Sequence, residues 1–311
     1  MSNRQVAQLS PTQQVALGLL KGVNMVYDVI TLPLYTALQA PWKHWQDSRQ
    51  IFARPIIPEN PHSPWARKQP CSLGKLENIQ TMDQLFRVAI EEYPDHPAMG
   101  TREVFGEEEE TQSDGKVFKK LILGDYKWIT FKEMNEKIEL VGRGLMSLGI
   151  RPRENIVILA DTRQEWMLTA QACLRLNIPV VTLYATLGEE GILHGINETE
   201  AQFLVTSQDL LDKLSKLAGR MPCLRTVIYM ESPAMKVKPH SIENIKMHPF
   251  SQLEMLGNSA DKNLKGETPT ADDIAIIMYT SGSTGVPKGV MISQGNIVAT
   301  TKGFYTIVPF V

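Results

Sequence analysis

The 311-residue sequence is poor in cysteine and in net charge, and each shortage excludes a class of protein. Its cysteines, Cys71, Cys173 and Cys223, are odd in number and far apart, which argues against a disulfide framework and against a zinc site. We expect Cys173 to be a small buried apolar group. A formal charge of −2 offers no basic field, so we expect no nucleic-acid partner. The remaining composition, 43% hydrophobic and 21% charged, is that of an ordinary globular chain.

An uninterrupted apolar run is also missing, even from the N-terminal segment that comes nearest to one. Residues 15–38 are mostly apolar, but Lys21 and Asp28 interrupt them and Pro33 should break or kink a helix. On a helix, one polar stripe would contain Gln14, Lys21, Asn24, Asp28 and Thr31. The opposite, apolar side would contain Val23, Val26, Ile30 and Leu34. This pattern favours an interfacial membrane anchor over residues 1–50, with a transmembrane span or a helix packed on the body as alternatives.

Prolines at 55, 58, 61, 64 and 70 dominate the next stretch. Because proline fixes φ and lacks an N–H group, this density should block helix and strand pairing alike. We therefore expect a linker over residues 51–80.

After the linker, the sequence alternates between helix-like and strand-like patterns. We expect a helix over 81–93, capped by Thr81. The acidic run at 107–110 should be a solvated loop and not a metal site, because neighbouring carboxylates repel one another. Strands are then expected at 155–160, 180–184, 202–206 and 225–230, separated by helices at 165–176, 189–197 and 209–217. This order predicts an α/β fold with a mostly parallel sheet covered by helices.

The most informative segment is the loop from Thr280 to Gly289, which reads TSGSTGVPKG. An apolar run at 274–279 predicts a buried strand before it, and residues 289–292 predict a strand after it, leading into a helix near Asn296. Three glycines allow close approach of the backbone, and hydroxyls, N–H groups and Lys288 can converge on phosphate oxygens. The spacing differs from a Walker A loop, because no hydroxyl follows the lysine. We expect a polyphosphate ligand; a plain surface turn is the alternative.

The stretch from Tyr279 to Gly289 closely resembles the phosphate-binding signature of the adenylate-forming enzymes, the superfamily of acyl-CoA synthetases and luciferases. Residues 119–124, 161–167, 181–188 and 194–200 resemble long-chain fatty-acid–CoA ligases in particular. The resemblance runs from about residue 65 to the end. It implies that residues 81–311 form the N-terminal part of the large adenylation domain.

The resemblance also implies a reaction and a set of site residues. The reaction is ATP-dependent activation of a long-chain fatty acid through an acyl-adenylate, followed by transfer to coenzyme A, with Mg²⁺ as cofactor. Lys288 would be the catalytic cation and the Thr280 hydroxyl the magnesium ligand. The phosphate-binding set would be Thr280, Ser281, Gly282, Ser283, Thr284, Gly285, Lys288 and Gly289. The enzyme would face the cytosol on a membrane, that of the endoplasmic reticulum first, or of mitochondria, peroxisomes or lipid droplets.

The sequence departs from the family in two respects. Family members are considerably longer, and their parts that hold adenine, ribose and a further magnesium ligand follow the loop, so we expect this chain to be truncated and inactive alone. This sequence has Gln294 at a position where many relatives have a histidine, which leaves open how the following helix is anchored. Tyr184 and Thr186 are candidates for lining the cleft, whereas Trp166 and His194 are expected to be structural. The alternative functions are a non-catalytic membrane-associated isoform and a ligase for another carboxylate.

Overall fold

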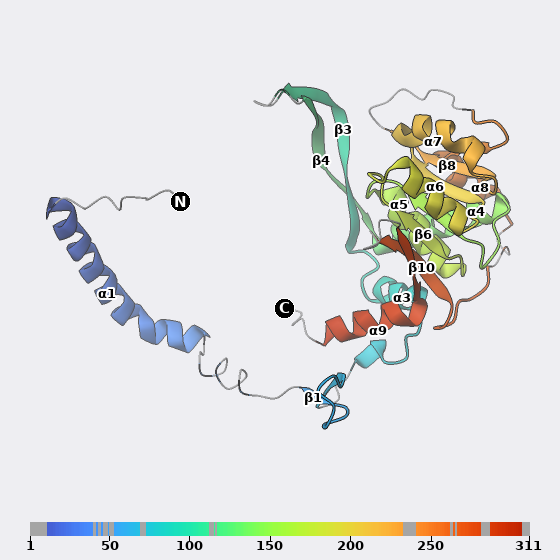
Figure 1. Ribbon diagram of the computed structural model, residues 1–311. Helices are drawn as coiled ribbons and strands as arrows, with labels where there is room; N and C mark the ends of the chain where they lie inside the picture. Colours follow the sequence, from blue (N-terminus) through green and yellow to red (C-terminus); the bar gives the residue numbers. More distant parts are fainter. Residues whose placement is uncertain are drawn as a thin grey trace. The chain divides into compact units, whose positions relative to one another are not determined.

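The computed structural model describes residues 11–39, 53–68, 73–111, 117–232, 241–261, 266–280 and 287–306, with single residues at 42, 45, 49, 115 and 264 (Figure 1). The chain divides into two compact units, residues 1–71 and 72–311.

The first unit begins with α1, Pro11–Gln39. A break at Pro33 is contradicted, because the helix continues through it. A proline removes one intrahelical hydrogen bond, here the one to the Val29 carbonyl, and the helix continues without it. In the following turn the Thr36 hydroxyl donates to the Pro33 carbonyl at 2.9 Å. Val23, Val26 and Ile30 are all exposed. No helix in the described part of the chain combines the length and the apolar character needed to cross a bilayer.

The proline-rich stretch contains a short ladder, which corrects the expectation that its prolines exclude pairing. Strand β1, Ala53–Pro55, pairs antiparallel with β2, Trp65–Arg67. Pro55, opposite Trp65, is tolerated because both strands of a two-stranded ladder are edge strands. The turn is closed by the Ile57 N–H group, which donates to the buried Ser63 hydroxyl at 2.7 Å.

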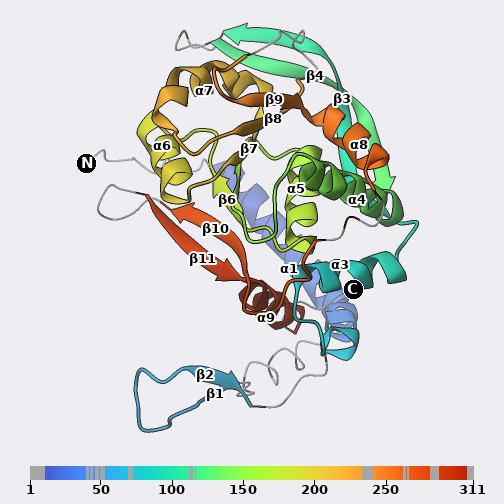
Figure 2. The same cartoon turned by 90° about the vertical axis from the view of Figure 1, so that its right-hand side faces the viewer.

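The second unit is built on a seven-stranded sheet with the order β11-β10-β6-β5-β7-β8-β9 (Figure 2). Its strands are β5 Ile156–Leu159, β6 Val180–Leu183, β7 Phe203–Ser207, β8 Thr226–Met230, β9 Lys246–Pro249, β10 Ile274–Thr280 and β11 Lys288–Ser293. All neighbours are parallel except β10 and β11. The predicted mostly parallel α/β sheet is therefore confirmed.

Helices cover both faces of this sheet. They are α3 Met82–Glu92, α4 Phe131–Ser147, α5 Gln164–Arg175, α6 Glu189–Glu198, α7 Leu211–Leu217, α8 Phe250–Ser259 and α9 Gln294–Tyr305. Short 3-10 turns lie at Gly74–Leu76, Gln208–Leu210 and Ala218–Arg220. The predicted cap of α3 is confirmed, because the Thr81 side chain accepts from the Gln84 N–H group in a capping box.

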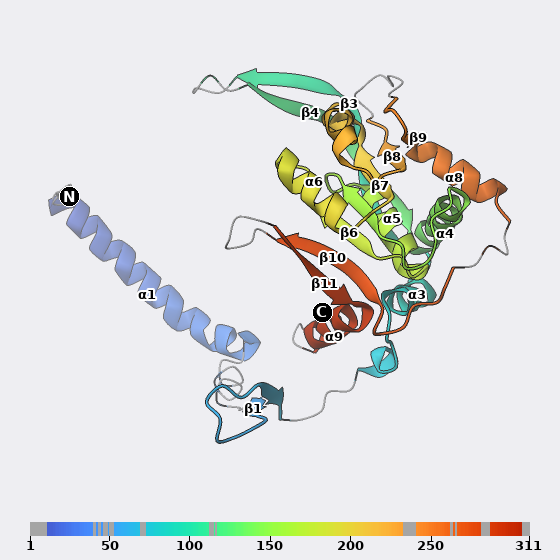
Figure 3. The ribbon, with the colours of Figure 1, turned by 45° about the vertical axis from the view of Figure 1, so that its right-hand side comes forward.

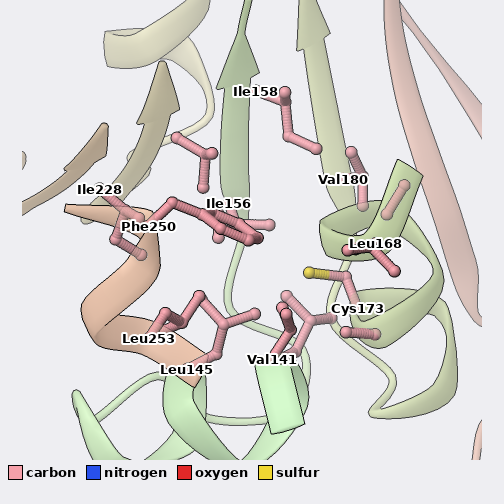
Figure 4. Close-up of a cluster of buried hydrophobic side chains, with 14 of the residues drawn as sticks. Val141, Leu145, Ile156, Ile158, Leu168, Cys173, Val180, Ile228, Phe250 and Leu253 are labelled. Atoms are coloured by element: carbon pink, nitrogen blue, oxygen red, sulfur yellow. The ribbon is translucent and has the colours of Figure 1, made fainter. Parts of the chain in front are cut away.

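Successive strand residues alternate between two apolar clusters, as the pleat requires. Ile156 and Ile158 face α4, α5 and α8 (Figure 4), whereas Val157 and Leu159 belong to the cluster of α6 and α7. Cys173 is fully buried in the first cluster, and burial raises the pKa of its thiol. The expectation that it is a buried apolar group is thus confirmed.

A long two-stranded arm precedes the sheet (Figure 3). It consists of β3, Pro97–Thr111, and β4, Val117–Thr130, paired antiparallel. The acidic run at 107–110 lies on β3 and not in a loop, which corrects the prediction. The charge run alone did not indicate a strand, because its partners come later in the sequence: β4 pairs with it, and Lys120 forms an ion pair with Glu110 across the ladder.

Candidate phosphate-binding site

The ends of the expected phosphate loop lie at the edge of the sheet where the parallel strands finish. Met278 of β10 is in register with Thr182 of β6, so Thr280 lies just beyond the carboxyl end of β6. Strands β5, β7 and β8 run in the same direction. This is the edge at which open α/β sheets bind their ligands.

Thr280 and Lys288 face each other directly across the β10–β11 ladder. Directly opposed residues project from the same face of an antiparallel pair, so the hydroxyl and the ammonium group share one side. Both residues are exposed, and Lys288 forms no ion pair with any residue that the structure describes. A phosphate at this position can therefore meet a cation and a hydroxyl together. The expected ligands Ser281, Gly282, Ser283, Thr284 and Gly285 lie outside the described residues.

Gly289 is opposite Tyr279, on the other side of the hairpin from Lys288. A Cβ atom at this position would lie 3.0 Å from Ile277 Cγ2 and 3.1 Å from Tyr279 Cζ. A side chain at 289 would thus press on the tyrosine ring. The geometry gives this glycine a packing role beside the loop.

Tyr279 is almost completely buried, and its hydroxyl donates a hydrogen bond to Glu198 Oε2 at the end of α6. Burial, and then the hydrogen bond and charge of Glu198, raise the pKa of this phenol. One turn earlier on the same helix, His194 Nε2 lies 3.1 Å from the Pro287 carbonyl oxygen. The His194 and Tyr279 rings meet edge to face at 6.0 Å. Helix α6 therefore contacts the chain on both sides of the loop.

Sequence reasoning missed this link between α6 and the loop. It treated His194 as structural and gave Glu198 no role. The available signal was their spacing, because residues four apart on a helix share a face. Nothing in the sequence indicated that this face meets the loop, since the contact joins segments far apart in the chain.

Gln294 anchors α9 without a histidine. It is 1% exposed, its Oε1 accepts from the Met82 N–H group at 3.0 Å, and its Nε2 donates to the Leu174 carbonyl at 3.4 Å. Near the other end of the helix, Lys302 donates to the carbonyls of Glu77 and Ile79, both at 2.8 Å. The anchoring left open by the sequence is thus provided by these four hydrogen bonds.

Three further residues were candidates for the cleft or for a structural role. Tyr184 and Thr186 are exposed just after β6, at the ligand-binding edge. Trp166 is half-buried and packs against the first apolar cluster. In the described part of the chain, no three or more His, Cys, Asp or Glu side chains are arranged to hold a metal ion. The exposed Thr280 hydroxyl still fits Mg²⁺ that arrives with a nucleotide, because this ion takes few protein ligands and otherwise binds water and phosphate.

The model of the AMP-binding enzyme family matches residues 86–310, which include both arms of the loop. The chain belongs to this family. It is 38% identical over 237 residues to the long chain acyl-CoA synthetase 8 of Arabidopsis thaliana, covering 75% of this chain and 32% of that protein. It is 31% identical over 247 residues to the long-chain-fatty-acid–CoA ligase 1 of Schizosaccharomyces pombe, covering 75% of this chain and 36% of that protein.

Among solved structures, the A-PCP didomain of the carboxylic acid reductase of Segniliparus rugosus, in complex with AMP, is similar with a TM-score of 0.58 and 17% identity. The similarity covers 74% of this chain and 34% of that chain. At this identity it shows that the AMP-binding enzyme fold is shared. The present chain spans about a third of the length of the curated relatives it matches.

Proposed function

We propose that this chain serves in the ATP-dependent activation of long-chain fatty acids to acyl-CoA through an acyl-adenylate. The observation that carries the proposal is the direct opposition of Thr280 and Lys288 at the carboxyl edge of a parallel sheet. The names of the relatives support the substrates, since they include a long chain acyl-CoA synthetase and a long-chain-fatty-acid–CoA ligase. The similar didomain was solved in complex with AMP, which supports a nucleotide as the ligand.

In the proposed reaction, a carboxylate oxygen of the fatty acid attacks the α-phosphorus of ATP and the bond to the β-phosphate breaks, which releases pyrophosphate. The thiol of coenzyme A then attacks the acyl carbon and AMP leaves. These steps depend mainly on neutralising phosphate charge. Lys288 stabilises the negative charge that develops on the pyrophosphate, and the Thr280 hydroxyl orients the same phosphate group. Mg²⁺, held in part by this hydroxyl, would supply further charge neutralisation.

We further propose that α1 lies in the surface of a membrane, with the enzyme facing the cytosol and the endoplasmic reticulum as the first expected location. Its exposed Val23, Val26 and Ile30 share one side of the helix, and the polar stripe with Lys21 and Asp28 lies on another. A helix of this kind binds with its apolar side among the acyl chains and its charges at headgroup level. This location suits a substrate that dissolves in bilayers.

Titration of MgATP into the 311-residue chain tests the proposed site. Calorimetry should detect binding, and Lys288→Ala should weaken it by about tenfold, because a charge-assisted hydrogen bond contributes roughly 1.5–3 kcal/mol. Lys216→Ala on α7 is the matched control, since it removes an exposed lysine of the same unit away from the loop and should leave affinity unchanged. Equal affinity of the wild type and Lys288→Ala would refute the assignment of the loop.

A further inference from the structure

We propose that His194 and Glu198 of α6 are positioning residues that fix both ends of the phosphate loop, Glu198 through Tyr279 and His194 through Pro287. Tyr279 immediately precedes Thr280, and Pro287 immediately precedes Lys288. The two contacts therefore act one residue away from the two groups assigned to phosphate. This inference deepens the proposed function, on which its nucleotide-binding consequence rests.

The geometry follows from one helix turn. His194 and Glu198 are four residues apart on α6, so they share a face. The same Glu198 oxygen that accepts from the Tyr279 hydroxyl lies 3.5 Å from His194 Nε2. Pro287 and Tyr279 thus meet neighbouring side chains on one rigid element, although they lie on opposite sides of the loop.

The chemistry of the donors and acceptors is consistent at every contact. A peptide carbonyl only accepts hydrogen bonds, so the contact with Pro287 requires a proton on His194 Nε2. An ionised carboxylate also only accepts, so the Tyr279 hydroxyl is the donor to Glu198. The Tyr279 phenol is protonated at neutral pH, as an ordinary tyrosine is, and its raised pKa acts in the same direction.

The exposure of the pair separates a positioning role from a general structural one. The His194 side chain is 33% exposed and that of Glu198 is 51% exposed. Solvent-exposed polar pairs contribute little to global stability. Their loss should therefore change the loop ends far more than the free energy of unfolding of the whole unit.

Two substitutions at position 194 make a matched test in the 311-residue chain. In His194→Gln the amide nitrogen can replace Nε2 as donor to Pro287, whereas His194→Leu removes the donor and keeps a similar volume. Tyr279→Phe removes only the hydroxyl that reaches Glu198. Glu189→Gln, in the exposed first turn of the same helix, is the control. Amide hydrogen exchange over residues 279–289, MgATP affinity and the urea midpoint are measured for each variant.

We expect His194→Leu and Tyr279→Phe each to speed exchange over 279–289 and to weaken MgATP by roughly fivefold, the equivalent of one hydrogen bond. The urea midpoint should stay near that of the wild type, and His194→Gln and the control should behave like the wild type. Unchanged exchange in both disruptive variants overturns the inference. So does faster exchange throughout the unit with a lowered midpoint, which indicates a structural role. If even the wild type binds no MgATP, the proposed function fails, and the exchange data still decide the positioning role.

Discussion

The side-chain oxygen of Gln294, at the first position of α9, accepts a hydrogen bond from the backbone N–H group of Met82, at the first position of α3. Two helix N-termini that are far apart in the sequence are thereby joined at a buried point. The same side chain also donates to Leu174 O, at the end of α5.

Gln294→Leu should destabilise the second unit, because it leaves the Met82 N–H group and the Leu174 carbonyl without this partner. The expected loss is about 2 kcal/mol or more in the free energy of unfolding, because two polar groups each lose a partner at a cost of roughly 1–3 kcal/mol. Urea denaturation followed by circular dichroism measures it. Ser293→Ala, which removes the N-cap hydroxyl that accepts from the Asn296 N–H group, is the comparison and should cost about 1 kcal/mol. A loss for Gln294→Leu no larger than that would contradict the anchoring role.

The close crossing of α4 and α8 depends on glycine. A Cβ atom on Gly257 would lie 1.9 Å from the Leu140 carbonyl oxygen, and one on Gly144 would lie 2.2 Å from that of Leu253. Gly257→Ala must therefore push the helices apart and should cost at least about 2 kcal/mol. Gly303→Ala in α9 has open space around it and should stabilise by roughly 0.5–1 kcal/mol through helix propensity. Thermal melting of both variants checks that Gly257→Ala lowers the melting temperature and Gly303→Ala raises it. Equal shifts of the melting temperature in the two variants would argue against the close crossing of α4 and α8.

Acid should weaken a cluster that joins the start of β5 to the segment before β10. In this cluster Glu267 accepts a hydrogen bond from Arg153, and the distance from Arg153 Nη2 to Glu267 Oε1 is 2.6 Å. This hydrogen bond lowers the pKa of the Glu267 carboxyl below its ordinary value of 4.5. A lowered folded-state pKa gives stability that is present above the unfolded value and is lost as the pH falls through the folded value. We therefore expect Arg153→Gln to reduce the loss of stability that occurs as the pH falls from above the unfolded-state pKa of Glu267 through its lowered folded-state pKa. Arg151→Gln, which is exposed and two residues earlier, is the control. The urea midpoint of each variant is measured as a function of pH. If the midpoint falls equally steeply with acidification in both variants, the effect is excluded.

Membrane binding through α1 should depend on which side of the helix carries a new charge. Val23→Glu places a carboxylate on the apolar side, whereas the neighbouring Asn24→Glu places the same charge on the polar stripe. With phosphatidylcholine vesicles, Val23→Glu should lower partitioning by about tenfold, which corresponds to the transfer of one valine side chain. Asn24→Glu should change it little. Co-sedimentation measures both, and equal effects would contradict an interfacial orientation.

The sequence predicted the regular part of the fold because its elements have local signals. The strands at β5 to β8 and the helices α3, α5 and α6 appear within about two residues of the expected bounds, as periodicity arguments usually allow. Helices α4 and α8, strand β9 and the β3–β4 arm were not expected from the sequence. The arm has no local signal because the exposed glutamates of β3 are poor strand formers on their own and become paired only with β4, later in the sequence.

The candidate site was predictable only in part, because only some of its features have a local sequence signal. The composition of the loop indicated phosphate, and its flanking strands were recognised from their apolar runs. The opposition of Thr280 and Lys288 follows from those two strands pairing with each other. The contacts of His194 with Pro287 and of Gln294 with Met82 depend on how distant elements pack, and no local pattern contains that information.

The β10–β11 hairpin also has a consequence for the order of folding. Its two strands are close in sequence, so closing it costs little chain entropy, whereas the pairing of β10 with β6 spans several intervening elements. Contacts of low sequence separation tend to form fast and distant ones slowly. The two residues assigned to the nucleotide can thus be brought together in a nascent ribbon before the sheet that later supports it is complete.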